Sequence, residues 1–215
     1  RDPELSRGLG DVYKRQRLLS MVSLEKTNRC SWAGEKPIYI KYHDEEWGVP
    51  VLNDQKFFEF LCLEGQQAGL SWITVLNKRE SYKRLFYNFN VLKVSKMSDS
   101  EIENLLLDKS IIRNRLKLYS IRNNAVFFLE IQKEYGSFND YIWSFVNGKT
   151  IHNNVLNIND IQTKNEISDK LSKDLKQKGF KFIGTTICYA FMQATGLIND
   201  HVKTCFRYNE IKNLE

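Results

Sequence analysis

The sequence of 215 residues lacks any apolar run near the length of about 20 residues that a membrane span needs. It has only three prolines, no glycine- or serine-rich linker and no internal repeat of fixed period. Alternation of polar and apolar residues, which is typical of half-buried strands, never continues beyond a few positions. These absences predict a chain without transmembrane helices, without a sharp domain boundary and without a large sheet.

Cysteine and histidine are also scarce, with four and three copies, so each can be examined as a metal ligand. Charges of the two signs nearly balance, since 32 Lys and Arg face 26 Asp and Glu, for a net charge of +6. That excess suits a polyanionic partner such as nucleic acid, yet it is also common in proteins that bind none. The charge alone therefore does not decide the class of partner.

Residues 1–20 combine charges, glycine and proline without helical or strand periodicity, and Met21 follows directly. They lack the apolar core and the small-residue cleavage site of a secretory signal, so export is not expected. We interpret residues 1–20 as a foreign or disordered leader and Met21 as the natural first residue. The folded domain is then expected over residues 21–206, followed by a C-terminal tail over residues 207–215.

Apolar residues at helical spacing, each set preceded by a capping residue, predict an all-α fold in a single compact domain. The expected N-caps are Asp54, Ser71, Ser100, Ser137 and Ser168. Glycines at positions 148, 179 and 196 mark helix ends. Residues 152–163 are rich in Asn and Asp and are expected to form a loop.

Two helical patterns within residues 171–196 are separated by the sequence GFKFIG at positions 179–184. The glycines permit a tight turn, and Ile183 can pack between the helices. Backbone N–H groups at the start of the second helix could bind a DNA phosphate, assisted by Lys178 or Lys181. The same layout suits an αα-hairpin that only packs, so a DNA-binding helix-hairpin-helix and a purely structural hairpin both remain open.

Four candidate metal ligands lie near the two ends of the chain. Cys30 and His43 are thirteen positions apart, and His201 and Cys205 are four apart. The shorter spacing predicts that the second pair shares one face of a helix, and a Cys2His2 set would give zinc a closed, structural site. The alternative is that both cysteines are small core residues and both histidines are ordinary polar residues.

The segment 32–72 is rich in aromatic residues and contains one carboxylate set among small and polar neighbours in the sequence CLEGQQAGLSW. The aromatic residues are Trp32, Tyr39, Tyr42, Trp47 and Trp72, and the carboxylate is Glu64. Ring faces attract positive charge and a carboxylate accepts hydrogen bonds, so such a cage suits a planar cation, for example an alkylated purine. The alternative is that the aromatic residues form core and Glu64 is only a charge near a helix end.

Several longer segments, taken together, resemble one known family. They are NRCSW, YIKYHDEEWGVP, CLEGQQAGLSWITVLNKRE, KSIIRNRLK, YIWSFVNG, LSKDLKQKGFKFIGTTICYAFMQATGLINDH and the final Cys205, which together extend over about residues 28–206. These segments are similar to those of the bacterial 3-methyladenine DNA glycosylase I family, within the helix-hairpin-helix superfamily.

The resemblance implies a monomeric, cytoplasmic repair enzyme that acts on alkylated double-stranded DNA. It implies that the enzyme flips N3-methyladenine out of the duplex and releases the base by hydrolysis, leaving an abasic site. It also implies that one structural zinc joins the two ends of the chain, bound by Cys30, His43, His201 and Cys205.

The resemblance further implies roles for residues around the base. Glu64 would contact the excised base, with Tyr42 and Trp72 against it and Tyr39 and Trp47 nearby. Leu70 would fill the gap left in the duplex, and the hairpin residues 181–186 would contact the DNA backbone. The wider superfamily carries an aspartate after the hairpin, and Asp200 is the nearest candidate here, for which we expect a structural role.

A cationic N3-methyladenine is already a good leaving group, so a strong general acid is not required. No lysine in the pocket motifs is placed as a Schiff-base nucleophile, which predicts base release without strand cleavage. A zinc-stabilised DNA-binding module without catalysis would share the hairpin but would have no need of Glu64 within an aromatic cage. A metallohydrolase would need an open zinc position, which four protein ligands do not leave.

Overall fold

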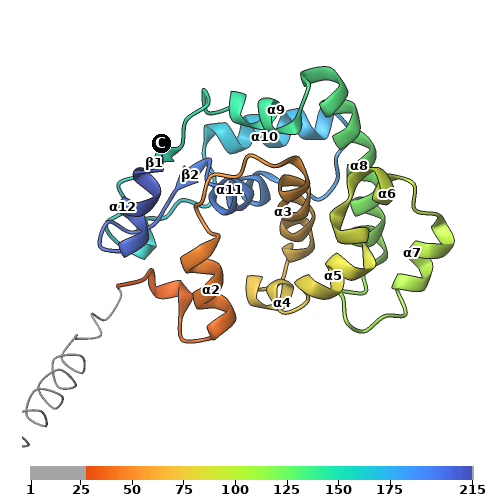
Figure 1. The fold of residues 1–215 in the computed structure, drawn as a ribbon, viewed down its shortest axis with the longest axis horizontal. Coiled ribbons are helices and arrows are strands. Elements are labelled where there is room, and N and C mark those ends of the chain that lie inside the picture. The colour runs from red at the N-terminus through yellow and green to blue at the C-terminus, as the bar shows by residue number, and fades with distance from the viewer. Residues whose placement is uncertain (1–27, 215) are drawn as a thin grey trace, which may run out of the picture.

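The structure is a computed structural model that describes residues 28–214. The helices of the first half are η2 (Ser31–Ala33), α2 (Pro37–Glu45), α3 (Asp54–Gln67), α4 (Trp72–Leu76), α5 (Arg79–Leu85), η3 (Tyr87–Phe89), α6 (Val91–Ser95) and α7 (Asp99–Leu105). The second half contains α8 (Arg115–Tyr135), α9 (Phe138–Ser144), η4 (Ile158–Asp160), α10 (Glu166–Gln177), α11 (Thr185–Ala194) and α12 (Phe206–Lys212). The predicted helical class is thus confirmed (Figure 1).

The strands of the described chain are two residues long. β1 (Ile151–His152) overlaps the segment 152–163, expected as a loop, only at His152. It pairs in parallel with β2 (Ile198–Asn199), which lies closer to the C-terminus. No helix within residues 28–214 has the length and apolar character needed to cross a membrane. The leader proposed for residues 1–20, with Met21 after it, lies outside the described residues. Most of the segment 207–215, expected as a tail, belongs to α12, where Tyr208 and Ile211 are buried.

Helix α3 occupies the centre of the fold and packs against α8, α9 and α11 (Figure 1). Every residue from Phe57 to Gln66 is buried, so this helix has almost no solvent-exposed face in its middle. Phe58 packs edge-on to Phe128 with ring centroids 5.3 Å apart, and Phe128 stacks on Phe138 at 4.0 Å. Full burial of each such side chain contributes about 1.5–3 kcal/mol, so these contacts fix α3 relative to its neighbours.

Two of the predicted N-caps are confirmed in position, because Ser71 and Ser137 directly precede α4 and α9. Three predictions are wrong by one to three residues, since the caps of α3, α7 and α10 are Asn53, Ser98 and Asn165, in place of Asp54, Ser100 and Ser168. In each case an earlier Asn or Ser adopts the extended backbone that a cap requires, and its side chain accepts a backbone N–H.

Asp54 has a different role from the predicted one. Its carboxylate accepts hydrogen bonds from the backbone N–H groups of Phe138 and Asn139, both at 2.9 Å, and from the side chain of Gln132 at 2.6 Å. The side chain therefore satisfies the free N–H groups at the start of α9 and ties that helix to α3.

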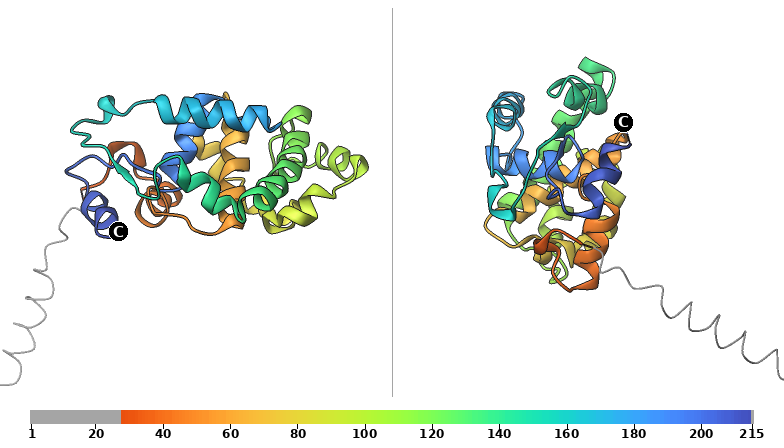
Figure 2. Two further views of the ribbon diagram at one scale, coloured as in Figure 1. Left: turned by 90° about the horizontal axis from the view of Figure 1, so that it is seen from above. Right: turned by 90° about the vertical axis from the view of Figure 1, so that its left-hand side faces the viewer.

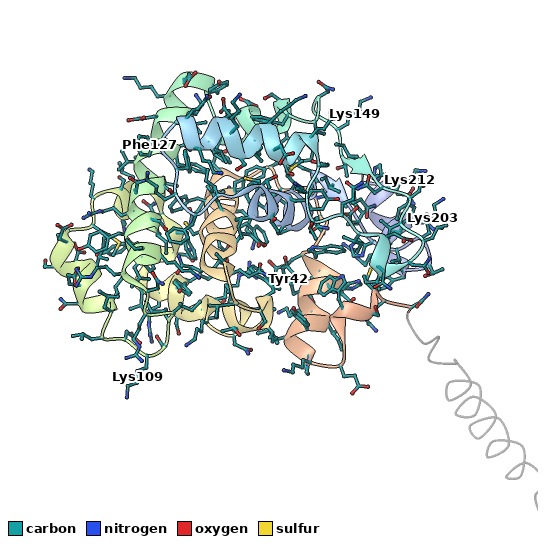
Figure 3. The ribbon with its side chains drawn as sticks, turned by 180° about the vertical axis from the view of Figure 1, so that it is seen from behind. Tyr42, Lys109, Phe127, Lys149, Lys203 and Lys212 are labelled. Carbon is teal, nitrogen blue, oxygen red and sulfur yellow. The ribbon has the colours of Figure 1, made fainter. Side chains whose placement is uncertain are left out.

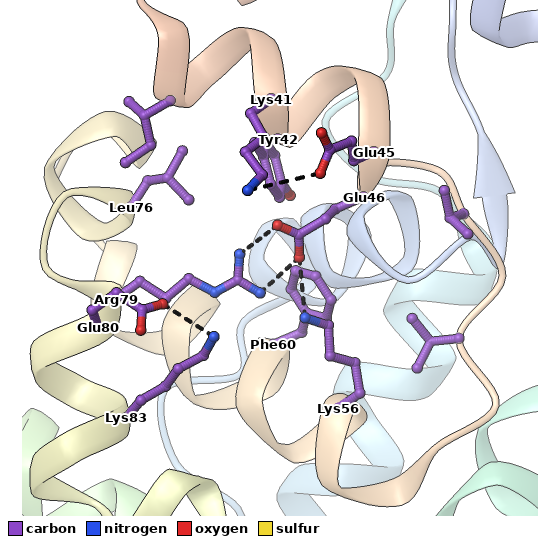
Figure 4. A pocket seen from close by; sticks show the side chains of 13 residues that line it. Lys41, Tyr42, Glu45, Glu46, Lys56, Phe60, Leu76, Arg79, Glu80 and Lys83 are labelled. Carbon is purple, nitrogen blue, oxygen red and sulfur yellow. Dashed lines mark hydrogen bonds and ion pairs between the residues drawn. The ribbon is translucent and has the colours of Figure 1, made fainter.

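A network of charged side chains joins α2, α3 and α5 (Figure 4). Arg79 forms a two-pronged pair with Glu46, at 2.8 and 2.7 Å, and donates to Glu59 at 2.6 Å. Lys56 also contacts Glu46, at 3.0 Å, and the network lines a cavity of about 520 Å³. Burial acts to raise the pKa of Glu46, but hydrogen bonds and positive charge from Arg79 and Lys56 outweigh it and lower the pKa to about 2.

We expect Arg79→Met to destabilise the protein by roughly 3–5 kcal/mol, because it leaves the buried Glu59 carboxylate without its main partner. A carboxylate with a lowered pKa contributes stability above its ordinary pKa of about 4.3 and loses it as the pH falls toward the folded-state value. Urea unfolding should therefore show a loss of stability between about pH 5 and pH 2 that is smaller in Arg79→Met. The exposed Arg84, in Arg84→Met, is the control, and equal effects of the two changes would contradict this account.

Candidate active site and metal centre

A group of aromatic side chains surrounds a cavity of about 240 Å³ that opens to solvent. Its walls come from η2, α2, α3, the start of α4 and α11, which are far apart in the sequence. The lining residues are Trp32, Tyr39, Tyr42, Trp47, Glu64, Gln67, Trp72, Ile161, Ala190 and Gln193. The structure thus brings together all five predicted cage aromatics and Glu64, whereas Leu70 does not line this cavity.

The rings that line the cavity pack against one another in tilted and edge-on arrangements. Tyr42 and Trp72 are tilted by 49° with centroids 5.3 Å apart, and Trp32 meets Trp47 edge-on at 4.9 Å. Tyr42 lies in the interior between α2 and α3 (Figure 3), where burial and then the charge of Glu64 raise the pKa of its phenol. Its hydroxyl therefore stays protonated, and its ring supplies an electron-rich wall.

The carboxylate of Glu64 is buried, with only 3% of the residue exposed. Burial raises the pKa of this carboxyl to about 8. Its Oε2 and the indole Nε1 of Trp72 are both buried without a hydrogen-bond partner among the described residues. An unsatisfied buried polar atom costs about 1–3 kcal/mol, so a ligand that offers a donor to Glu64 and an acceptor to Trp72 would relieve both costs.

Gln193 is a cavity residue that the sequence analysis missed. Its Nε2 donates to Asp200 at 2.7 Å, and because a carboxylate only accepts, the amide oxygen of Gln193 takes no part in this hydrogen bond. Asp200 also accepts from Tyr189 at 2.8 Å and from Asn153 at 2.7 Å. Asp200 thus orients Gln193 and does not line the cavity itself. A polar residue three positions after Ala190 on an apolar helix was the available sequence signal.

The turn after α3 presents Leu70 at the surface. Gly69 has a φ of +75°, a backbone conformation that residues with a Cβ rarely adopt. The next residue, Leu70, is 43% exposed. An exposed leucine on a sharp turn beside a ligand cavity is the geometry that an apolar wedge requires.

The predicted hairpin connects α10 and α11, and Ile183 is buried, with its backbone carbonyl accepting a hydrogen bond from Ser172 of α10 at 2.7 Å. Gly184 is the N-cap of α11 and no side chain caps the helix, so N–H groups at its start are free to bind an anion. Lys178 is engaged with Glu134 at 2.8 Å, whereas Lys181 forms no ion pair within the described part of the chain. Of the two lysines considered from the sequence, Lys181 is the one available for a phosphate.

The four candidate metal ligands converge into one buried cluster. The ligand atoms of Cys30, His43, His201 and Cys205 all lie within 4.8 Å of one another. Cys205 Sγ is 3.5 Å from His43 Nε2 and from His201 Nδ1, and Cys30 Sγ is 3.6 Å from His201 Nδ1. A tetrahedral zinc with Zn–S bonds of about 2.3 Å and Zn–N bonds of about 2.0–2.1 Å has S···N edges of about 3.5 Å, so the cluster fits this ion.

Each histidine of the cluster is held through its other ring nitrogen. His43 Nδ1 lies 2.7 Å from the carboxylate of Asp44, which in turn pairs with Arg29, and His201 Nε2 lies 3.0 Å from the carbonyl of Trp47. Such partners fix the ring orientation and the ligating nitrogen. A hydrogen bond between the two thiols lowers the pKa of Cys205 and raises that of Cys30.

The predicted shared helix face for His201 and Cys205 is wrong. β2 ends at Asn199 and α12 begins at Phe206, so both ligands lie in the intervening loop, with Cys205 as the N-cap of α12. The loop curls because Cys205 N–H donates to the carbonyl of Val202 at 2.7 Å. A spacing of four residues therefore brings the two ligands together through a turn in place of a helix.

Comparison with known proteins places this architecture. The family model described as methyladenine glycosylase matches residues 32–208. The DNA-3-methyladenine glycosylase of Haemophilus influenzae is 52% identical over 179 residues, which cover 83% of this chain and 97% of the relative. DNA-3-methyladenine glycosylase 1 of Escherichia coli is 51% identical over 180 residues, covering 84% and 96%.

Solved structures agree with the sequence relatives. A crystal structure of 3-methyladenine DNA glycosylase I superposes with a TM-score of 0.82 at 49% identity, covering 83% of this chain and 98% of that one. The Staphylococcus aureus enzyme, whose structure addresses 3-methyladenine recognition, has a TM-score of 0.81 at 40% identity, covering 84% and 96%. A tyrosine-to-phenylalanine variant of such an enzyme, in complex with 3-methyladenine, also has a TM-score of 0.81, covering 83% and 96%. This chain therefore belongs to the methyladenine glycosylase family.

Proposed function

We propose that this protein is a base-excision repair glycosylase that removes N3-methyladenine from alkylated duplex DNA and leaves an abasic site. The observation that carries the proposal is the buried, unpartnered carboxylate of Glu64 inside an aromatic cavity. The cavity of about 240 Å³ is smaller than the roughly 300–1,000 Å³ of typical drug-sized sites, which suits one base in place of a whole nucleotide.

Recognition is proposed to depend on charge. Flipping a nucleotide out of the duplex costs a few kcal/mol, and a base that carries a positive charge regains it between Tyr42 and Trp72, whose ring faces attract cations. The exocyclic amine of the base would donate to Glu64, and a nearby cation would favour the ionised carboxylate that burial alone disfavours. Neutral adenine offers no such compensation, so the cavity discriminates against it.

The chemical step needs little from the protein. When the glycosidic bond breaks, its electron pair moves to the methylated base, which becomes neutral, and the sugar becomes an oxocarbenium ion. Water then adds to C1′ and loses a proton, which gives the abasic site. None of the described residues that line the cavity is a lysine, so a covalent Schiff base with the sugar is not proposed, and strand cleavage is not expected.

The finer assignments are part of the same proposal. Leu70 is proposed to fill the gap in the duplex, and Tyr39 and Trp47 to complete the wall around the base. Residues 21–206 form the proposed glycosylase domain, acting as a monomer on chromosomal DNA. Because the named relatives are bacterial, we propose that the enzyme works in the bacterial cytoplasm.

We also propose that Cys30, His43, His201 and Cys205 bind one zinc ion, and the S···N distances of 3.5 and 3.6 Å support this assignment. The ion would cross-link the two ends of the described part of the chain, which lie on the same side of the molecule (Figures 1 and 2). With four protein ligands no position is left for a reacting water, so its contribution is structural.

Glu64→Gln is expected to lower kcat/KM for release of N3-methyladenine by about 10- to 100-fold, because a hydrogen bond to a charged group is worth about 1.5–3 kcal/mol. Activity that depends on the ionised carboxylate should rise with pH toward the free-enzyme pKa of about 8, and this rise should disappear in the variant. The measurement is base release from duplex DNA, with the exposed Glu130→Gln as control. Unchanged release by Glu64→Gln would remove Glu64 from the proposed role.

Lys181→Met is expected to weaken binding to damaged and undamaged duplexes alike, since a phosphate contact carries no base information. Loss of one such contact should reduce the slope of log K against log salt concentration by about 0.9. Lys178→Met is the matched control, because Lys178 is paired with Glu134. An unchanged salt slope in Lys181→Met would exclude this lysine from the phosphate contact.

Cys205→Ser is expected to abolish stoichiometric zinc binding and to lower the melting temperature, as measured by elemental analysis and thermal unfolding. Cys62→Ala provides the control, because Cys62 is a buried core residue outside the cluster, and its loss should cost stability while zinc is retained. Zinc at one equivalent in Cys205→Ser, or none in the wild-type protein, would contradict the assignment.

A further inference from the structure

Helix α8 carries a buried lysine that points at the end of α3. Lys117 is only 6% exposed, and its Nζ donates to the backbone carbonyls of Gln66 at 2.8 Å and Ala68 at 2.6 Å. In return, the side-chain amide of Gln66 donates to the carbonyl of Lys117 at 3.0 Å. The contacted carbonyls belong to the last turn of α3 and the residue after it, immediately before Gly69 and Leu70.

The buried position of this lysine lowers the stability of the fold unless its hydrogen bonds compensate for the lost hydration. Burying an ammonium group is unfavourable, and burial lowers the pKa of Lys117. The ammonium charge of Lys117 is stabilised by the C-terminal end of α3, where the last carbonyls lack helical partners and the helix dipole is negative. Lys117 thus acts as the C-terminal cap of α3 and determines where the Leu70 turn leaves the helix.

Two turns further along the same helix, Asn124 holds the hairpin. Its Nδ2 donates to the carbonyl of Lys181 at 3.0 Å, and its Oδ1 accepts from the N–H of Lys181 at 2.8 Å. The neighbouring Asn123 donates to the carbonyl of Gly179 at 2.9 Å. Asn124 is 3% exposed, so this bidentate clamp is shielded from water.

Helix α3 and the hairpin also lie next to each other. A Cβ placed on Gly65 of α3 would lie 3.4 Å from the carbonyl oxygen of Phe182, which is an ordinary van der Waals distance, so the hairpin backbone passes close to α3 near its C-terminal end. Lys117 and Asn124 are seven residues apart, which places them on one face of α8 at a separation of about 10 Å. Helix α8, which lies beside α3 in Figure 1, therefore contacts both the turn after α3 and the hairpin, and it sets the distance between them.

We infer that Lys117 is a positioning residue for the Leu70 wedge and that α8 sets the spacing between this wedge and the phosphate-binding hairpin. This inference rests on the proposed function, because it assigns Leu70 to the gap in the duplex. A wedge enters the stack productively only at a fixed distance from the point where the hairpin holds the backbone, and a misplacement of about 1 Å can cost on the order of 100-fold in rate.

The test compares binding to an intact duplex with binding to one that carries an abasic-site analogue, in which a gap is already present. Wild-type protein should prefer the abasic analogue, and Leu70→Ala and Lys117→Met should each reduce this preference by roughly tenfold. If Lys117 acts by positioning Leu70, the double variant should lose no more than the larger single loss. Additive losses, or an undiminished preference in Lys117→Met, would overturn the inference.

Matched variants separate positioning from general stability. Lys117→Arg keeps a cation able to reach the carbonyls and should recover part of the preference, whereas the exposed Lys133→Met on the same helix should have no effect. Binding of free 3-methyladenine, followed by tryptophan fluorescence, should be retained in Lys117→Met, and its loss together with the preference would show a structural role only. A wild-type protein that prefers the abasic analogue but releases no base would contradict the proposed function and leave the inference standing.

Discussion

Helix α3 is buried on every side from Phe57 to Gln66, so the carboxylates in this part of the helix are buried as well. Two of them, Glu59 and Glu64, lie five residues apart and have opposite fates. Burial acts to raise the pKa of Glu59, but Arg79 outweighs it and lowers that pKa, whereas nothing opposes burial at Glu64 and its pKa rises to about 8. Carboxylates whose surroundings separate their pKa values can have different roles, which supports a structural role for Glu59 and the proposed ligand-binding role for Glu64.

The Cys2His2 cluster and the aromatic cavity share residues and neighbouring segments of the chain. Tyr42 and His43 are neighbours on α2, so fixing His43 in the cluster also fixes the direction in which Tyr42 faces. Trp47 contributes a cavity wall, packs edge-on to His201 with ring centroids 4.6 Å apart, and accepts a contact from that ring at its carbonyl. A metal ion bound at this cluster, as proposed, would therefore also order the aromatic walls, which come from segments far apart in the sequence.

Much of this site could be read from residue types. The aromatic cage, Glu64 and the Cys2His2 set were identified from pattern and resemblance, and the structure brings them together. Partners created only by the tertiary fold were not predictable. The sequence does not show that Lys178 forms an ion pair with Glu134, or that Lys117 donates hydrogen bonds to the carbonyls at the end of α3. The misplaced caps have a similar cause, since Asn165 and Ser168 are both good caps and only the backbone decides between them.

The central claim is that the cavity excises a cationic base and does not merely bind it. The most direct measurement follows free base and abasic sites when the wild-type protein is incubated with one duplex containing N3-methyladenine and an otherwise identical duplex containing adenine. We expect release of N3-methyladenine with an equal yield of abasic sites and no release of adenine. Tight binding of the damaged duplex with no base released would contradict it.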